Sequence, residues 1–199
     1  MSASMLGSAR AMSSNLHGLS EMLRRTVVEV RSGESGSGTG IIWGGAGLVV
    51  TNAHCAPRNM LLEVGGDGKW RGAEPLAYHP QHDLALLAAP SVSGPLLETR
   101  DADSLRAGEL VFAYGHPLGI HDSLAMGVVH GITRDDRTGS PRWIIADVRL
   151  APGNSGGPLV DAEGRLVGIN SMVVNGLGVA VPAALVHRFV ERALTRRAA

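Results

Sequence analysis

Asn154-Ser155-Gly156-Gly157-Pro158, inside the stretch Ala-Pro-Gly-Asn-Ser-Gly-Gly-Pro-Leu-Val (151–160), places one serine between glycines. A serine hydroxyl is a weak nucleophile until a base takes its proton, and that base needs an acid to hold its tautomer. Upstream, Thr51-Asn52-Ala53-His54-Cys55 supplies a histidine and His82-Asp83-Leu84 supplies an aspartate. The order His, Asp, Ser, each in a distinctive setting, predicts nucleophilic catalysis by serine of the kind that endopeptidases use.

The turn around Ser155 also predicts where a developing negative charge would be held. Glycines at 153 and 156 let the backbone take a tight, unusual turn. We expect the N–H groups of Gly153 and Ser155 to form the oxyanion hole. Two alternatives remain: a glycine-rich hairpin loop with an incidental serine, and the Gly-x-Ser-x-Gly elbow of α/β-hydrolases. The elbow needs a helix after the serine and a later histidine, but the following residues look like a strand and only His187 follows.

His54 and Asp83 each sit beside an apolar run. His54 follows the run 48–51, and a strand end gives a base an accessible edge. Asp83 precedes the run 84–87, where a carboxylate can accept the imidazole N–H and stay ionised. The other histidines lack such a setting; His79 and His82 form at most a weak metal pair, so we expect neither a metal site nor a cofactor.

Length, composition, charge and cysteine count limit the classes of protein to which the chain can belong. Its 199 residues, 44% of them hydrophobic, suffice for one large or two small domains. Lysine plus arginine and aspartate plus glutamate are 18 each, which gives no electrostatic case for nucleic acid or an anionic membrane. Cys55 is the only cysteine, so no internal disulfide is possible. Without a signal-peptide pattern or a membrane-spanning run, we expect a cytoplasmic protein.

Short apolar runs punctuated by glycine and proline predict an all-β fold. The chain has 27 glycines and only 4% aromatic residues, and this spacing of runs is typical of sandwiches or barrels. A polar connection over 88–104 divides the runs into two sets and suggests paired barrels, about 26–95 and about 105–182. The expected strands are 26–30, 40–43, 48–51, 61–64, 84–87, 109–114, 123–133, 142–148, 158–161, 165–174 and 177–181.

Helices are expected at both ends of the chain. In the N-terminal segment 1–25, residues 13–25 place an apolar face on a packing helix. At the other end, Pro182 fits the first turn of a helix over 183–197, and arginines crowd its end. The apolar face of that helix comprises Leu185, Val186, Phe189, Val190 and Leu194.

Together these motifs resemble the chymotrypsin-like serine peptidases, and within them the HtrA/Deg group. The resemblance covers roughly 26–190. It implies two six-stranded antiparallel β-barrels with the triad in the cleft between them, His54 as general base, Asp83 as its orienting acid and Ser155 as nucleophile. It is carried, in order, by Ser37-Gly38-Thr39-Gly40, Val50-Thr51-Asn52-Ala53-His54, Asp83-Leu84-Ala85-Leu86-Leu87, Ala113-Tyr114-Gly115-His116-Pro117-Leu118-Gly119, Pro152-Gly153-Asn154-Ser155-Gly156-Gly157-Pro158-Leu159-Val160, Gly168-Ile169-Asn170-Ser171 and Gly178-Val179-Ala180-Val181-Pro182.

The resemblance also implies how a protein or peptide substrate binds. The substrate would add as a strand beside residues 169–173, with Leu150 and Val173 lining the primary pocket. Both side chains are aliphatic, so we expect cleavage after small or medium apolar residues, unless Arg149 reaches the pocket base. The substrate-binding residues expected are Leu150, Ile169, Asn170, Ser171 and Val173.

Some residues depart from the family pattern. Ala151 replaces the usual asparagine, Cys55 replaces a common valine, and Asn154 replaces the aspartate that pairs with a cleaved N-terminus in trypsins. Activation by clipping is therefore not expected, and a PDZ domain would be absent or supplied by another chain. A regulatory partner protein and an oligomer are compatible with the sequence. The alternative function is a catalytically silent or partner-gated peptide-binding module on the same fold.

Overall fold

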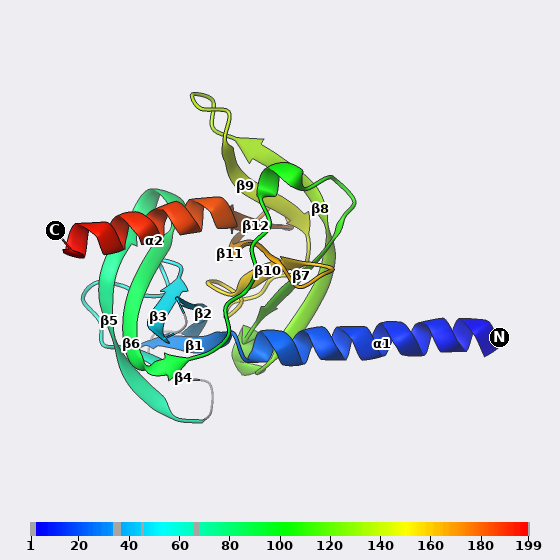
Figure 1. Ribbon diagram of the computed structural model, residues 1–199, viewed down its shortest axis with the longest axis horizontal. Helices are drawn as coiled ribbons and strands as arrows, with labels where there is room; N and C mark the ends of the chain where they lie inside the picture. The colour runs from blue at the N-terminus through cyan, green and yellow to red at the C-terminus, as the bar shows by residue number, and fades with distance from the viewer. Residues whose placement is uncertain (1–2, 34–36, 45, 66–67, 199) are drawn as a thin grey trace.

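A computed structural model describes residues 3–33, 37–44, 46–65 and 68–198, and these form two closed antiparallel barrels (Figure 1). The strand order is β1-β2-β3-β6-β5-β4 in the first barrel and β10-β11-β12-β9-β8-β7 in the second. This confirms the predicted fold of two six-stranded barrels. The first barrel contains β1 (Val27–Ser32), β2 (Ser37–Trp43), β3 (Ala46–Thr51), β4 (Leu62–Gly65), β5 (Trp70–His79) and β6 (Leu84–Ser93). The second contains β7 (Leu110–Gly115), β8 (Ser123–Arg134), β9 (Pro141–Asp147), β10 (Pro158–Asp161), β11 (Leu166–Val174) and β12 (Leu177–Pro182).

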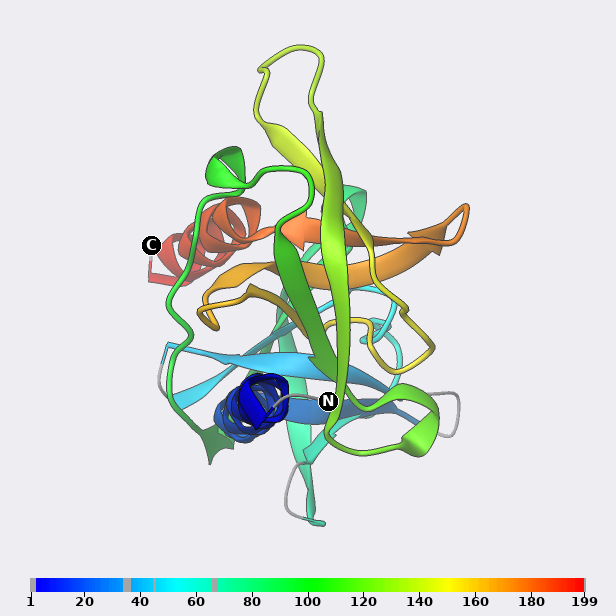
Figure 2. The ribbon, with the colours of Figure 1, turned by 90° about the vertical axis from the view of Figure 1, so that its right-hand side faces the viewer.

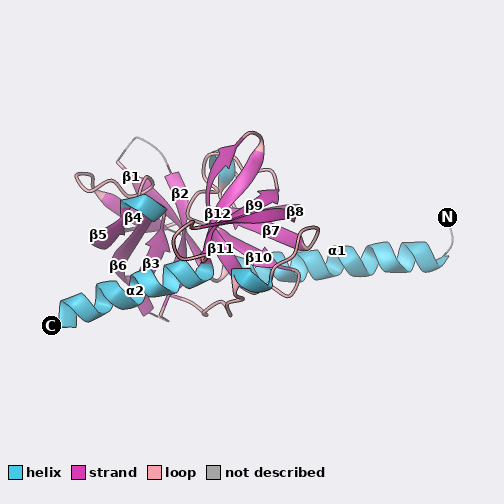
Figure 3. Ribbon diagram, turned by 90° about the horizontal axis from the view of Figure 1, so that it is seen from above, coloured by secondary structure: helices cyan, strands magenta, loops and turns pink. Residues whose placement is uncertain are grey.

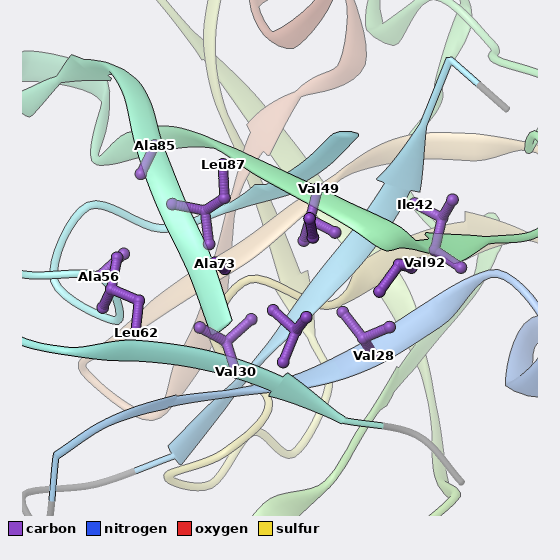
Figure 4. Packing of buried hydrophobic residues seen from close by; sticks show 12 residues of the cluster. Val28, Val30, Ile42, Val49, Ala56, Leu62, Ala73, Ala85, Leu87 and Val92 are labelled. Carbon is purple, nitrogen blue, oxygen red and sulfur yellow. The ribbon is translucent and has the colours of Figure 1, made fainter. Parts of the chain in front are cut away.

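Each barrel is filled by side chains from alternating strand positions. In the first barrel, valines and leucines from facing strands meet in the interior (Figure 4). Val30, Val49 and Leu87 there have no exposed surface. A further cluster lies between the barrels, where Ile41 and Leu86 of the first meet Ile169 of the second. Burying such side chains contributes roughly 1.5–3 kcal/mol each, so the seam between the barrels is itself a hydrophobic core.

Two long helices complete the fold, and they leave the barrels in opposite directions (Figure 3). α1 (Ala3–Arg24) leads into β1 and is seen nearly end on in Figure 2. Its last turns pack on the second barrel through Leu23, which contacts the cluster that holds Phe112 and Tyr114. α2 (Ala183–Ala198) follows β12 and packs against strands of both barrels. Neither described helix is long and apolar enough to cross a bilayer.

The structure differs from the predicted secondary structure at several places. α1 lies within the expected helical segment 1–25 and begins at Ala3, before the apolar face expected over 13–25, because residues 3–12 are mostly helix-compatible and contain no proline. The strand β5 was missed because Pro75 and a weak alternation hide its period. β6 continues through the predicted connection to Ser93.

Pro90 is tolerated inside β6 for a visible reason. The pairing of β6 with β3 jumps from Ala88 to Ser93, so Pro90 lies in an irregular stretch that pairs with neither neighbouring strand. Its missing N–H therefore costs no ladder hydrogen bond. β1 extends to Ser32, beyond the expected strand end at 30, and β2 begins at Ser37, before the expected position 40; residues 34–36 lie outside the described part.

The contact between α1 and the second barrel predicts a stability effect. Leu23 is fully buried, so Leu23→Ala should leave a cavity and lower the free energy of unfolding by about 2–5 kcal/mol. Leu6, on the same helix, is 55% exposed, so Leu6→Ala should change it by less than about 0.5 kcal/mol. Urea denaturation followed by circular dichroism measures both. Equal effects of the two substitutions would contradict this account of the packing.

Candidate active site

His54, Asp83 and Ser155 come from three separate segments and meet at the seam between the barrels. His54 follows β3, Asp83 directly precedes β6, and Ser155 lies in the loop between β9 and β10. His54 and Ser155 line one cleft of about 550 Å³. The side chain of His54 is 51% exposed and that of Asp83 only 17%. The aspartate therefore stands behind the histidine, away from solvent.

Asp83 holds His54 through two hydrogen bonds. The Nδ1 of His54 lies 2.8 Å from the Oδ2 of Asp83, and the backbone N–H of His54 donates to Oδ1 at 3.1 Å. Asp83 itself has φ +52 at the end of η1 (Pro80–His82), and its carbonyl accepts a hydrogen bond of 2.8 Å from the Asn52 side chain. Backbone contacts thus hold Asp83 in place, independently of the hydrogen bonds between its side chain and His54.

The pair shifts the pKa values of both residues. The hydrogen bond to Asp83 is the main reason that the pKa of His54 is raised to about 10. Burial pushes the pKa of Asp83 upward, but hydrogen bonds from His54 and Ser171 outweigh it and lower that pKa. A raised folded-state pKa means that the His54 contribution to stability is complete below its ordinary pKa and is lost as pH rises toward about 10.

Ser171 of the second barrel contacts both Asp83 and Ser155. Its hydroxyl donates to the Oδ2 of Asp83 at 2.7 Å, and its carbonyl accepts the Ser155 hydroxyl at 3.0 Å. Among the hydrogen bonds of the described residues, none joins Ser155 to His54. A protonated imidazole has no free lone pair to accept from the serine, which fits the high pKa of His54. The Ser155 hydroxyl is therefore turned away from the base.

The loop before Ser155 leaves two of its described peptide N–H groups without an acceptor. The carbonyl of Pro152 accepts from Leu118 N–H at 2.8 Å, and because a trans peptide points its N–H opposite to its carbonyl, the Gly153 N–H faces the other way. Within the described part of the chain, no acceptor engages the N–H of Gly153 or Ser155. These two donors are the pair that the sequence predicted for an oxyanion hole.

Glycine is required at 153 by both conformation and space. Its φ is +104, a backbone region that other residues rarely adopt. A Cβ at this position would also collide with the carbonyl of His116. Thr39 fixes the loop from the first barrel: its hydroxyl donates to the Gly153 carbonyl at 2.7 Å and its N–H to the Ser155 carbonyl at 2.8 Å. The loop is therefore held by both barrels.

The residues expected to bind substrate divide into two groups. Leu150, Ser171 and Val173 line the cleft together with Met172, and Arg149 is not among its lining residues. Ile169 instead packs in the core between the barrels, and the buried side chain of Asn170 donates to the Pro158 carbonyl at 3.0 Å. The side chains of Ile169 and Asn170 thus do not reach the cleft. The pairing of β11 with β10 ends at Ile169, which leaves one edge of the later residues without a strand partner.

Sequence reasoning missed two positioning roles. Thr39 lies in a motif that supported the family resemblance, but nothing in its spacing assigned it to the loop of Ser155. Ser171 was expected to contact substrate only, whereas its hydroxyl also holds Asp83. The Nδ1 atoms of His79 and His82 lie 3.2 Å apart, and the described residues contain no group of three or more potential metal-binding side chains.

The chain is similar to proteases of known type. Residues 38–169 match the trypsin-like peptidase domain. The putative serine protease HhoB of Synechocystis sp. is 31% identical over 172 residues, which cover 82% of this chain and 41% of HhoB. The mitochondrial serine protease HTRA2 of Drosophila pseudoobscura pseudoobscura is 33% identical over 170 residues, 81% of this chain and 40% of that protein. The chain thus spans about two fifths of the length of these relatives.

Solved structures of related proteases have the same fold as this chain. The crystal structure of Deg5 superposes with a TM-score of 0.79 at 26% identity, covering 89% of this chain and 92% of Deg5. The HtrA-type protease AlgW with a tripeptide superposes with a TM-score of 0.78 at 27% identity, covering 89% of this chain and 62% of that one.

The hydrogen bond between Asp83 and His54 predicts a titration. In Asp83→Asn the carboxylate that stabilises the charged imidazole is lost, so the His54 pKa should fall from about 10 toward its ordinary value of 6.5. NMR of the imidazole nitrogens measures it. Asp147→Asn, which changes an exposed carboxylate on β9, is the matched control and should leave His54 unaltered. An unchanged His54 titration in Asp83→Asn would show that Asp83 is not the cause of the shift.

Proposed function

The chain belongs to the trypsin-like peptidase domain family, and from this premise we propose that it is an HtrA-type serine endopeptidase that cleaves through an acyl-enzyme. The observation that supports this most is that two features occur together at the cleft. One is an imidazole held by a carboxylate, and the other is a pair of N–H groups without an acceptor, in and beside Ser155. Each element is part of acyl transfer, and neither is needed to stabilise a barrel.

The mechanism starts with a rotation of Ser155. Its hydroxyl leaves the Ser171 carbonyl, turns about χ1 to another staggered position and donates to the neutral imidazole of His54. His54 takes the proton as the oxygen attacks the substrate carbonyl. The N–H groups of Gly153 and Ser155 then bind the oxyanion, and His54 returns the proton to the leaving amine. Water hydrolyses the acyl-enzyme by the same steps, with His54 again as base.

His54 must be neutral to begin this cycle. The high pKa keeps the half-exposed imidazole protonated at neutral pH, with Asp83 as counter-ion. A peptide in the cleft would cover the exposed part of the ring, and loss of water disfavours the charged form and lowers its pKa. Substrate binding would therefore favour the base form of His54 at the moment when it is used.

We propose that the substrate lies extended along the free edge of β11. AlgW has been solved with a tripeptide, and that relative has the same fold. Leu150 and Val173 line the cleft here and make its wall aliphatic. Since Arg149 does not line it, cleavage after small or medium apolar residues is the preference that these side chains support.

A second candidate is a partner-gated enzyme or a silent peptide-binding module. The resting position of the Ser155 hydroxyl favours it, because the nucleophile is bonded to a carbonyl and not to the base. The two candidates differ in whether Ser155 reacts without a partner.

A fluorophosphonate distinguishes them, because it needs only an activated serine and an oxyanion hole. We expect a single adduct on the intact wild-type chain by mass spectrometry and none on Ser155→Ala. Ser13→Ala, at an exposed site on α1, should label like wild type. The rate should rise with pH toward about 10, because the neutral fraction of His54 rises. A folded protein that gives no adduct at alkaline pH would rule out an enzyme that is active alone.

The pocket wall predicts a change in specificity. Leu150 lies against Gly178 of β12 and lines the cleft. Leu150→Ala should enlarge the pocket and shift the ratio of kcat/KM for cleavage after phenylalanine against cleavage after valine by about tenfold in favour of phenylalanine. Fluorogenic peptides that differ only at this position measure the ratio. An unchanged ratio would place the primary pocket elsewhere, and Leu185→Ala, outside the cleft, should leave it unaltered.

A further inference from the structure

Arginines gather around a groove away from the catalytic cleft. The groove has a volume of about 800 Å³ and lies between α2, β5 and the loop that follows His54. Figure 1 shows α2 lying across the first barrel near β5. The groove and the cleft share no lining residue. We define this basic groove by its five arginines, which are Arg58, Arg188, Arg192, Arg196 and Arg197.

The charge of the basic groove is uncompensated within the described chain. No ion pair joins any of its five arginines to a carboxylate there. All five are exposed. Arg58 lies over the ring of Tyr78, 4.5 Å from its centroid, which restrains its guanidinium beside the groove residue Tyr78. Burial and nearby charged groups lower the pKa of His82, so this histidine adds little positive charge to the groove.

Helix capping does not explain this arrangement. Arg196 and Arg197 lie in the last turn of α2, where positive charge suits the helix dipole. Arg188 and Arg192 lie further back on the same stripe, at spacings of four residues, where like charges repel one another. Arg58 comes from a different element. An anionic ligand in the basic groove would relieve this repulsion.

Apolar side chains also line the basic groove, which narrows the class of ligand. Its apolar lining residues, which we call the floor, include Leu76, Leu185 and Phe189. A nucleic-acid backbone presents phosphates joined by polar sugars and carries no apolar side chain, so it would leave most of this floor unused. An acidic peptide with apolar side chains would cover the apolar floor and pair its carboxylates with the arginines.

We propose that the basic groove is a docking site for an acidic segment, with apolar anchor residues, of a second protein. The charge complementarity of the five arginines carries the proposal, and the separate lining of groove and cleft means that the segment can bind while a substrate occupies the cleft. The site does not depend on the proposed peptidase activity, because binding is measured without turnover.

Fluorescence anisotropy with a defined probe tests the docking site. The probe is a fluorescein-labelled peptide of glutamates with leucine at every third position. Arg188→Glu with Arg192→Glu should weaken its binding by about tenfold or more at low salt, because attraction becomes repulsion. Arg10→Glu with Arg137→Glu is the control of equal charge change at exposed sites outside the groove, and it should change binding less than twofold. Equal losses in the two double variants would overturn the proposal.

Further probes decide whether the basic groove prefers a peptide to other polyanions. A peptide of the same charge with serine in place of leucine should bind several-fold more weakly, because it leaves the floor uncovered. A single-stranded oligonucleotide and phosphatidylglycerol vesicles should compete only weakly. If the serine peptide binds equally well, or if either competitor binds more tightly than the leucine probe, the basic groove is a general polyanion site and the proposal is wrong. Circular dichroism confirms that each variant is folded.

Discussion

The candidate site depends on contacts that cross the seam between the two barrels. Asp83 belongs to the first barrel, yet the Ser171 hydroxyl of the second donates to its carboxylate. In the other direction, Thr39 of the first barrel binds the carbonyls of Gly153 and Ser155 in the second. Neither barrel alone contains all of these partners. The apolar cluster between the barrels therefore stabilises the fold and also sets the positions of Asp83 and of the loop that precedes Ser155.

The same contacts explain the resting state. The Ser171 hydroxyl donates to Asp83 and its carbonyl accepts from Ser155, so one residue holds the Asp83 carboxylate in place and the Ser155 hydroxyl away from His54. The ion pair of Asp83 with protonated His54 stabilises this state, since it leaves the imidazole without an acceptor for the serine. His54 and Asp83 are in contact, but the Ser155 hydroxyl is bonded to the Ser171 carbonyl and not to His54. Binding that removes water from His54 would shift this balance.

Much of this arrangement could be predicted from sequence, and the exceptions have physical reasons. The settings of His54, Asp83 and Ser155 are local, because each lies at the end of an apolar run or in a glycine turn. The roles of Thr39 and Ser171 are not local, because their partners are far away in the chain. The side chain of Ile169 faces the core between the barrels, which the order of the sequence motifs alone did not reveal. The strand β5 has no clear alternation and was missed.

The net charge of the chain did not predict the basic groove. Equal numbers of acidic and basic residues gave no reason to expect an anionic partner, yet a sum over the chain says nothing about where charges gather. The basic groove forms only when α2 folds across β5 and brings its arginine stripe beside Arg58. Its lining also includes His82, directly before Asp83, while Arg58 follows His54 by one short loop. The segments that carry His54 and Asp83 thus continue into the basic groove, although the groove and the cleft share no lining residue.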